Sequence, residues 1–135
     1  QETCAGIAAT FVCGWCLTRG ANLQKYVFKT TGGSLFGMGT ETVPGTRLLC
    51  CGFWGLARHV NYCGEIIQSV ALALPGFLAA DSQYYRLLPW AYPLYYVAIL
   101  FPRQMDDDDQ MKAKYGKAFG EYVRRVPARI IPGVW

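Results

Sequence analysis

Residues 52 to 62 read Gly52-Phe53-Trp54-Gly55-Leu56-Ala57-Arg58-His59-Val60-Asn61-Tyr62, a dense polar and aromatic patch between apolar segments. A second patch begins at 112 to 116 and continues to Gly133, with a similar mixture of cations, tyrosines and glycine. Polar clusters flanked by membrane-type segments are typical of functional sites. We therefore expect the two patches to form one cofactor pocket.

The composition indicates a membrane protein. Of the 135 residues, 53% are hydrophobic and only 16% are charged, which is more apolar than a typical soluble domain of this length. The sequence starts at Gln1, and no signal-peptide pattern precedes the first apolar run. We interpret the chain as a C-terminal fragment of a longer protein.

Three apolar stretches predict an all-α, multi-pass membrane fold. They cover residues 3 to 18, 63 to 80 and 87 to 102, each near the lower limit of about 17 residues for a spanning helix. Glu2, Glu65 and Arg86 lie close to the ends of these stretches, where charge is tolerated.

The distribution of Lys and Arg predicts the orientation. Three crossings place a loop at 19 to 62 and a tail at 103 to 135 on one side, with only a short turn at 81 to 86 opposite. All of the 13 Lys and Arg residues except Arg86 then share the loop and tail side. The positive-inside rule makes that side cytosolic.

The tail is predicted to hold a cytosolic amphipathic helix at 106 to 125. Asp106 to Asp109 would occupy its first turn and Arg124 and Arg125 its last, the favourable sense for the helix dipole. Pro127 would end it. Apolar side chains recur at helical spacing along it, at Met111, Tyr115, Phe119, Tyr122 and Val123.

Several side chains are candidates for binding a phosphate-bearing, planar ligand. Lys25 and Lys29 share a helical face and, with Arg58, could hold a phosphate; equally, the lysine pair could face lipid headgroups. Trp54 beside Gly55 could stack on a heterocycle or anchor the chain at the membrane interface. One of the aspartates at 106 to 109 could accept a hydrogen bond from a ligand. The residues alone leave these alternatives open.

The pattern of potential metal ligands predicts no metal site. His59 is the only histidine, without a Cys, Asp or Glu at ligand spacing, so a structural role is favoured. Cys13 and Cys16 match a redox spacing but lie inside an apolar stretch without a second pair. No glycine-rich phosphate loop of the Rossmann or P-loop type is present, so a nucleotide would be held in another way.

Four motifs resemble the C-terminal part of the sterol reductase family, which includes delta14-, delta7- and C24(28)-sterol reductases and the lamin B receptor. The resemblance covers the chain from about residue 19 to the end. Its motifs are Ala21-Asn22-Leu23-Gln24-Lys25, then Leu48-Leu49-Cys50-Cys51 with the 52 to 62 patch, then Lys114-Tyr115-Gly116, then Val126-Pro127-Ala128-Arg129-Ile130-Ile131-Pro132-Gly133.

The resemblance implies a multi-spanning membrane protein, of the endoplasmic reticulum if eukaryotic, that uses NADPH to reduce a sterol double bond. Membrane lipids and a sterol are the implied partners, with no nucleic acid. The positions that match the family's cofactor contacts are Lys25, Lys29, Leu49, Trp54, Asn61, Tyr62, Asp107, Met111, Lys112, Ala113, Lys114, Tyr115 and Tyr122.

Three positions depart from the family pattern. Asp106 stands where the family usually has Arg, Pro102 where it often has His, and Glu65 where it usually has Asp. Lys29 also stands where Arg is usual, which would lose bidentate geometry toward a phosphate. The change at 106 reverses a charge beside the expected pocket.

The implied reaction is protonation of the sterol alkene followed by hydride delivery from NADPH. The proton donor is expected in upstream helices, so the fragment alone should be inactive. Delta14 is the favoured double bond, with delta7 and C24(28) as alternatives. Isoprenylcysteine-type membrane methyltransferases share an Arg-His motif and a late Tyr-Gly tail, and a non-catalytic scaffold like the lamin B receptor is a third interpretation.

Overall fold

The computed structural model describes residues 1 to 134, and Trp135, the end of the expected cytosolic tail, lies outside the described residues. The described chain is helical, with one isolated bridge between Thr42 and Leu49, which confirms the predicted all-α class. The helices are α1 (Glu2–Thr31), α2 (Phe53–Leu56), α3 (Val60–Ala79), α4 (Gln83–Leu87), η1 (Leu88–Trp90), α5 (Ala91–Tyr115) and α6 (Lys117–Arg125).

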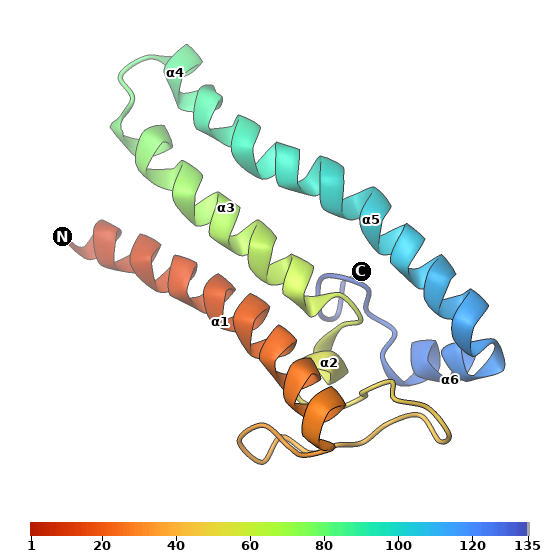
Figure 1. Ribbon diagram of the computed structural model, residues 1–135. Coiled ribbons are helices and arrows are strands. Elements are labelled where there is room, and N and C mark those ends of the chain that lie inside the picture. The colour runs from red at the N-terminus through yellow and green to blue at the C-terminus, as the bar shows by residue number, and fades with distance from the viewer. Residues whose placement is uncertain (135) are drawn as a thin grey trace.

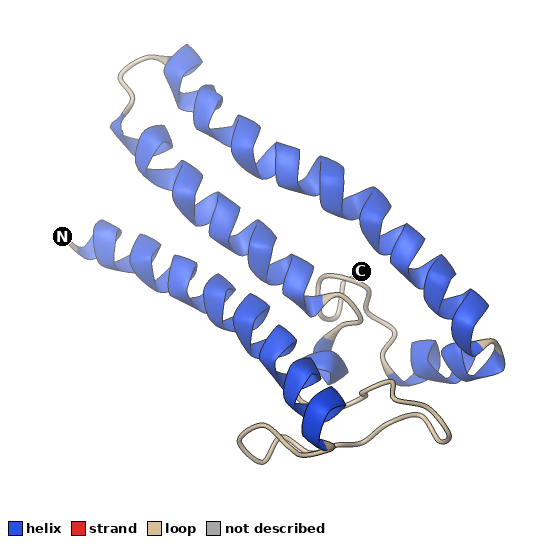
Figure 2. Cartoon of the chain, viewed as in Figure 1, coloured by secondary structure: helices blue, strands red, loops and turns tan. Residues whose placement is uncertain are grey.

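Three long helices, α1, α3 and α5, form the body of the molecule (Figures 1 and 2). The short elements α4 and η1 join α3 to α5 at one end, and Arg86 on α4 lies there. The other end holds α2, α6, the loop between α1 and α2, and the C-terminal segment. All other Lys and Arg residues lie away from the α4 end, as the charge distribution predicts.

Small residues allow α1 and α3 to pack closely. A Cβ atom added to Gly14 would lie 2.7 Å from the carbonyl oxygen of Gly64, so neither position has room for a side chain. Next to this crossing, the Thr18 hydroxyl donates to the carbonyl of Asn61 at 3.0 Å. Small residues with nearby interhelical hydrogen bonds are the usual means of packing helices within a membrane.

The first helix is longer than predicted. We expected a span ending at residue 18 and a loop from 19, but α1 continues to Thr31 and ends at Gly32, which adopts a left-handed φ of 71°. No proline interrupts residues 19 to 31, so nothing ends the helix earlier. The expected loop therefore begins as helix, and Lys25 and Lys29 lie on α1.

Within residues 1 to 134, α1 and α3 are the helices that are long and apolar enough to cross a membrane. The third predicted span, at 87 to 102, is not one of them. Its residues are divided among the end of α4, η1 and the first half of α5, and the second half of α5 is strongly charged.

The predicted boundary between the third span and the amphipathic helix is wrong. We expected a separate helix at 106 to 125, but α5 runs unbroken to Tyr115. The break falls at Gly116, whose φ of 54° and ψ of −123° suit glycine best, and α6 then starts at Lys117. The predicted apolar stripe is nevertheless present, since Phe119 and Tyr122 are buried in one core cluster.

The acidic run Asp106 to Asp109 therefore lies inside α5 and not at a helix start. The helix-dipole interpretation of this run is wrong, because Pro102 does not end the preceding helix. A proline in a helix removes one backbone hydrogen bond, but the rest of the turn can continue. Asp107 and Asp108 instead face side chains that pack beside α5, whereas Asp106 and Asp109 are exposed.

Two small cores fix the end of the molecule opposite α4. One joins α1 to the α2 region through Ala21, Leu49, Trp54, Ala57 and Val60, and the second joins the loop to α6 through Val43, Leu48, Phe119, Tyr122 and Val126. The C-terminal segment is tied to the start of α3, because the N–H groups of Arg58 and His59 donate to the carbonyls of Ala128 and Arg129.

Candidate functional site

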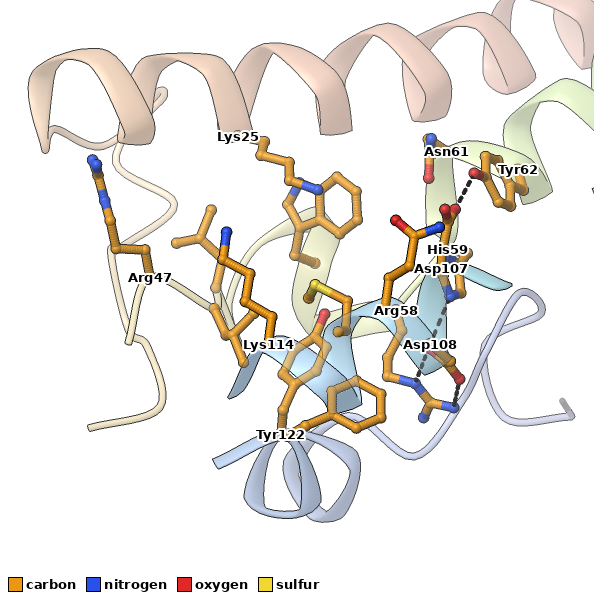
Figure 3. A pocket seen from close by; sticks show the side chains of 16 residues that line it. Lys25, Arg47, Arg58, His59, Asn61, Tyr62, Asp107, Asp108, Lys114 and Tyr122 are labelled. Carbon is orange, nitrogen blue, oxygen red and sulfur yellow. Dashed lines mark hydrogen bonds and ion pairs between the residues drawn. The ribbon is translucent and has the colours of Figure 1, made fainter. Parts of the chain in front are cut away.

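A cavity of about 340 Å³ lies between these cores, and side chains from α1, α2, α3, α5, α6 and the loop line it (Figure 3). Its size is within the usual range for a small-molecule or cofactor site. The lining residues are Lys25, Arg47, Leu48, Leu49, Trp54, Arg58, His59, Asn61, Tyr62, Asp107, Asp108, Gln110, Met111, Lys114, Phe119 and Tyr122.

The cavity brings together most of the residues that the sequence proposes as cofactor contacts, from both predicted patches. These are Lys25, Leu49, Trp54, Asn61, Tyr62, Asp107, Met111, Lys114 and Tyr122. The expectation of one pocket built from two segments thus agrees with the positions of these side chains. What the cavity binds is a separate question.

Four proposed residues do not line the cavity. Lys29 is exposed in the last turn of α1. Lys112 and Ala113 are exposed on α5, because the helix directs Met111 and Lys114 inward and the residues between them away. Tyr115 packs against the core cluster around Phe119.

The wall formed by α2 is held against α1 by hydrogen bonds. The indole Nε1 of Trp54 donates to the carbonyl of Ala21 at 2.8 Å, and the indole is almost fully buried. The buried Gln24 amide donates to the Cys51 carbonyl and accepts from the N–H of Phe53. Lys25 Nζ lies 4.3 Å from the centroid of the Trp54 ring, a cation–π contact.

On the side of α5, Asp108 is the centre of an ion-pair network. The Arg58 guanidinium, with its side chain only 3% exposed, lies 3.1 Å from Asp108 Oδ2 and also donates to the carbonyls of Val126 and Pro127. His59 Nε2 lies 3.0 Å from Asp108 Oδ1. Burial raises the pKa of Asp108, but the hydrogen bonds and charges of His59 and Arg58 outweigh it and lower this pKa below its usual value.

This network changes the interpretation of Arg58. The sequence allowed its guanidinium to join Lys25 and Lys29 around a phosphate, but in the structure it is paired with Asp108. His59 lines the cavity and pairs with the same carboxylate. Among residues 1 to 134, no three His, Cys, Asp or Glu side chains are grouped to hold a metal ion.

Asp107 has different partners from its neighbour Asp108. The Tyr62 hydroxyl donates to Asp107 Oδ2 at 2.5 Å, and Arg103 Nε lies 3.4 Å from Oδ1. The ring of Tyr62 stacks on His59 with centroids 5.3 Å apart and planes 10° from parallel. The two adjacent carboxylates are thus linked through a stacked pair of rings, and the Tyr62 phenol and Asp107 face the cavity.

The floor of the cavity comes from α6. Tyr122 is buried, and burial, with smaller effects of the Cys50 thiol and other charges, raises the pKa of its phenol above the usual value. Tyr122 is therefore neutral at physiological pH and, with Phe119 and Met111, gives the cavity an apolar surface beside its charged groups.

Sequence reasoning missed several lining residues: Arg47, Leu48, His59, Asp108, Gln110 and Phe119. His59 and Asp108 could have been found, because one lies inside the quoted motif and the other follows Asp107. Arg47 gives no local signal. Its place in the wall depends on contacts with the distant end of α1.

Comparisons with known proteins give the same family along the chain. The family described as the Ergosterol biosynthesis ERG4/ERG24 family matches residues 1 to 135. The protein named Delta(14)-sterol reductase TM7SF2 of Mus musculus is 42% identical over 127 residues, which is 92% of this chain and 29% of that protein. The Delta(14)-sterol reductase of Arabidopsis thaliana is 34% identical over 125 residues, covering 93% of this chain and 32% of the plant protein.

A relative with a different name matches at a similar level. The Probable 7-dehydrocholesterol reductase of Acanthamoeba polyphaga mimivirus is 34% identical over 131 residues, which is 92% of this chain and 28% of the viral protein. The chain thus spans less than a third of the length of each of these relatives. Because the family match extends over the whole chain, the protein belongs to the Ergosterol biosynthesis ERG4/ERG24 family of sterol reductases.

Proposed function

We propose that this chain forms the NADPH-binding end of a membrane-bound sterol reductase that saturates the delta14 double bond. The observation on which this rests is the division of the cavity. Lys25, Arg47 and Lys114 supply positive charge, whereas Tyr62 with Asp107 supplies a hydrogen-bonding phenol and carboxylate. A cofactor with phosphates at one end and a polar heterocycle at the other fits such a site.

The cationic part suits the phosphates. No carboxylate in residues 1 to 134 lies within ion-pair distance of Lys25, Arg47 or Lys114, so these charges remain available to a bound anion. The Trp54 ring, fixed by its bond to α1, offers a flat wall. A protein that binds a dinucleotide without a Rossmann fold requires both features.

The other part suits the nicotinamide. Asn61 and Asp107 offer hydrogen-bonding groups for a carboxamide, and Met111 and Tyr122 provide apolar surface. When bound, NADPH supplies the hydride that saturates a carbon–carbon double bond. The residues of this chain bind the cofactor, orient its ring and limit the access of water.

The membrane placement follows from the two helices that can span a bilayer. We place the cavity on the cytosolic side, where the Lys and Arg residues gather, and Arg86 on the opposite side. In this arrangement residues 87 to 102, which include η1 and the apolar half of α5, are proposed as a third, short crossing near the lower limit of spanning length. The membrane is that of the endoplasmic reticulum if the source is eukaryotic.

The names of two relatives favour delta14 as the double bond, and the viral relative keeps delta7 as the second candidate. C24(28) reduction has less support. The family match disfavours an isoprenylcysteine-type methyltransferase. A non-catalytic scaffold that retains the cavity would bind the same cofactor. Only an assay of sterol turnover separates it from a reductase.

The test is cofactor binding in detergent, using the longest product that the gene encodes. NADPH, NADH and S-adenosylmethionine are titrated against the wild type, Lys25→Ala and Asp107→Ala, with Arg124→Ala as the control. Arg124 is an exposed cation on α6 that does not line the cavity, so its loss should leave binding unchanged. Sterol products are then separated after incubation with a delta14-unsaturated and a delta7-unsaturated sterol.

Preferential NADPH binding that weakens in both cavity variants, together with loss of the delta14 bond, would support the proposal. Preference for S-adenosylmethionine would contradict it and favour a methyltransferase. NADPH binding without reduction of either sterol would contradict delta14 and delta7 reduction and leave the C24(28) reductase and the scaffold.

A further inference from the structure

We infer that Arg47 recognises the 2′-phosphate of the cofactor and so determines the preference for NADPH over NADH. The inference rests on the proposed function and adds a residue that the motifs do not indicate. Its basis is the way in which Arg47 is held at the end of α1 while part of its guanidinium remains unused.

Arg47 is anchored by the C-terminus of α1. Its Nη2 group donates to the carbonyl of Lys29 at 2.7 Å and to that of Phe28 at 3.3 Å, and its guanidinium carbon lies 5.7 Å from the centroid of the Phe28 ring. The last carbonyls of a helix lack partners within the helix, and a cation there is favoured by the helix dipole. The guanidinium is thus fixed before any ligand arrives.

The remaining donors of Arg47 are available. The hydrogen bonds to α1 use Nη2 alone, so Nε and Nη1 have no hydrogen-bond partner among residues 1 to 134. No described carboxylate pairs with it either, in contrast to Arg58. A pre-positioned, planar guanidinium with free N–H groups is the side chain best suited to grip a phosphate oxygen pair.

The position of Arg47 selects the 2′-phosphate. In Figure 3 it lies at the opposite side of the cavity from Tyr62 and Asp107, where the nicotinamide is proposed to bind. The 2′-phosphate is carried on the adenosine ribose, the far end of the dinucleotide. As a phosphomonoester it carries close to two negative charges at neutral pH, so it gains most from an added cation.

Lys29 is the competing candidate, because the sequence pairs it with Lys25. The Arg47 and Lys29 side chains are both exposed, but only that of Arg47 lines the cavity, and the backbone carbonyl of Lys29 holds Arg47. In the structure, the lysine therefore contributes through its backbone, and the arginine supplies the cavity-lining charge.

The experiment measures dissociation constants for NADPH and NADH in detergent for the wild type, Arg47→Gln, Arg47→Lys and Lys29→Gln. Glutamine keeps an N–H donor for the α1 carbonyls but removes the charge, and lysine keeps the charge but loses the planar fork. We expect Arg47→Gln to weaken NADPH binding by about tenfold to a hundredfold, the usual effect of losing charge-assisted hydrogen bonds, with NADH binding nearly unchanged. Arg47→Lys should lie between, and Lys29→Gln should change the ratio little.

A purely structural role for Arg47 predicts a different result, since loosening the end of α1 would weaken NADPH and NADH equally. An unchanged NADPH-to-NADH ratio in Arg47→Gln, or a ratio that collapses in Lys29→Gln instead, would overturn the inference while leaving the proposed function intact. A wild-type protein that binds neither nucleotide would refute the proposed function, and this inference with it.

Discussion

Two groups of charged side chains line the cavity, and they differ in whether their charges are paired within the protein. Arg58 and His59 both pair with Asp108, Arg58 also donates to backbone carbonyls, and the Arg58 side chain is 3% exposed. Around Lys25, Arg47 and Lys114, no described carboxylate pairs with the cations. The first group therefore builds the wall of the site, whereas the second has no counter-charge within the described chain.

The largest effect on stability should come from breaking the paired group of Asp108, Arg58 and His59. Asp108→Ala leaves the buried Arg58 guanidinium without its counter-charge, which typically costs about 3 kcal/mol or more of folding stability. Thermal unfolding of the purified protein would measure the loss, and Asp108→Asn should lose less because it keeps an acceptor oxygen. A melting temperature equal to that of the wild type would mean that Arg58 does not need this partner.

The unpaired cations Lys25, Arg47 and Lys114 should respond in the opposite way. Lys25→Ala removes a cation that lies over the Trp54 ring and has no carboxylate within ion-pair distance in residues 1 to 134, so we expect little change in melting temperature. NADPH affinity should fall by about tenfold, the usual order for one lost charge-assisted contact. Equal losses of stability and affinity would show that the lysine also belongs to the wall.

Acid should distinguish the two groups further. The pKa of Asp108 is lower in the folded state than in the unfolded chain, so the stabilisation that it provides is complete above the unfolded value and is lost as pH falls through the folded value. Stability should therefore decline below about pH 4, and the decline should be shallower in Asp108→Asn. Melting temperatures measured from neutral to acidic pH in both proteins would test this, and identical acid profiles would assign the decline to other carboxylates.

The smallest effect is expected for an ion pair outside both groups. Glu121 pairs with Arg124 and Arg125 on the exposed face of α6, and these bonds lower the pKa of its carboxyl. Exposed pairs of this kind contribute little to stability. Glu121→Gln should leave both the melting temperature and NADPH binding at wild-type values, and a loss of binding would show that α6 must be held by this pair.

The sequence was sufficient for the all-α class and for the convergence of the two patches, because apolar runs and motif residues are local features. Helix ends were less predictable. Residues 19 to 31 contain no helix-ending residue, so α1 extends beyond the apolar stretch, and Pro102 does not interrupt α5. Only Gly116 ends that helix, through a backbone conformation that no charge pattern indicates.

A residue's place in the cavity was predictable where the family resemblance marks its position, as for Trp54, Tyr62 and Asp107. It was not predictable where a role depends on packing. Arg58 is withdrawn from ligand binding by Asp108, 50 positions away, and Arg47 is recruited by carbonyls on α1. Such partnerships arise only once the helices have assembled.

The continuity of α5 constrains how the gene can change. Its apolar first half and its aspartates belong to one unbroken helix, from Ala91 to Tyr115. Inserting or deleting a single codon between them would rotate Asp107 and Asp108 by about 100° relative to the first half, because an α-helix has about 3.6 residues per turn. A flexible linker would absorb such a change. Length variation in this family should therefore avoid this segment and accumulate in the loop that follows α1.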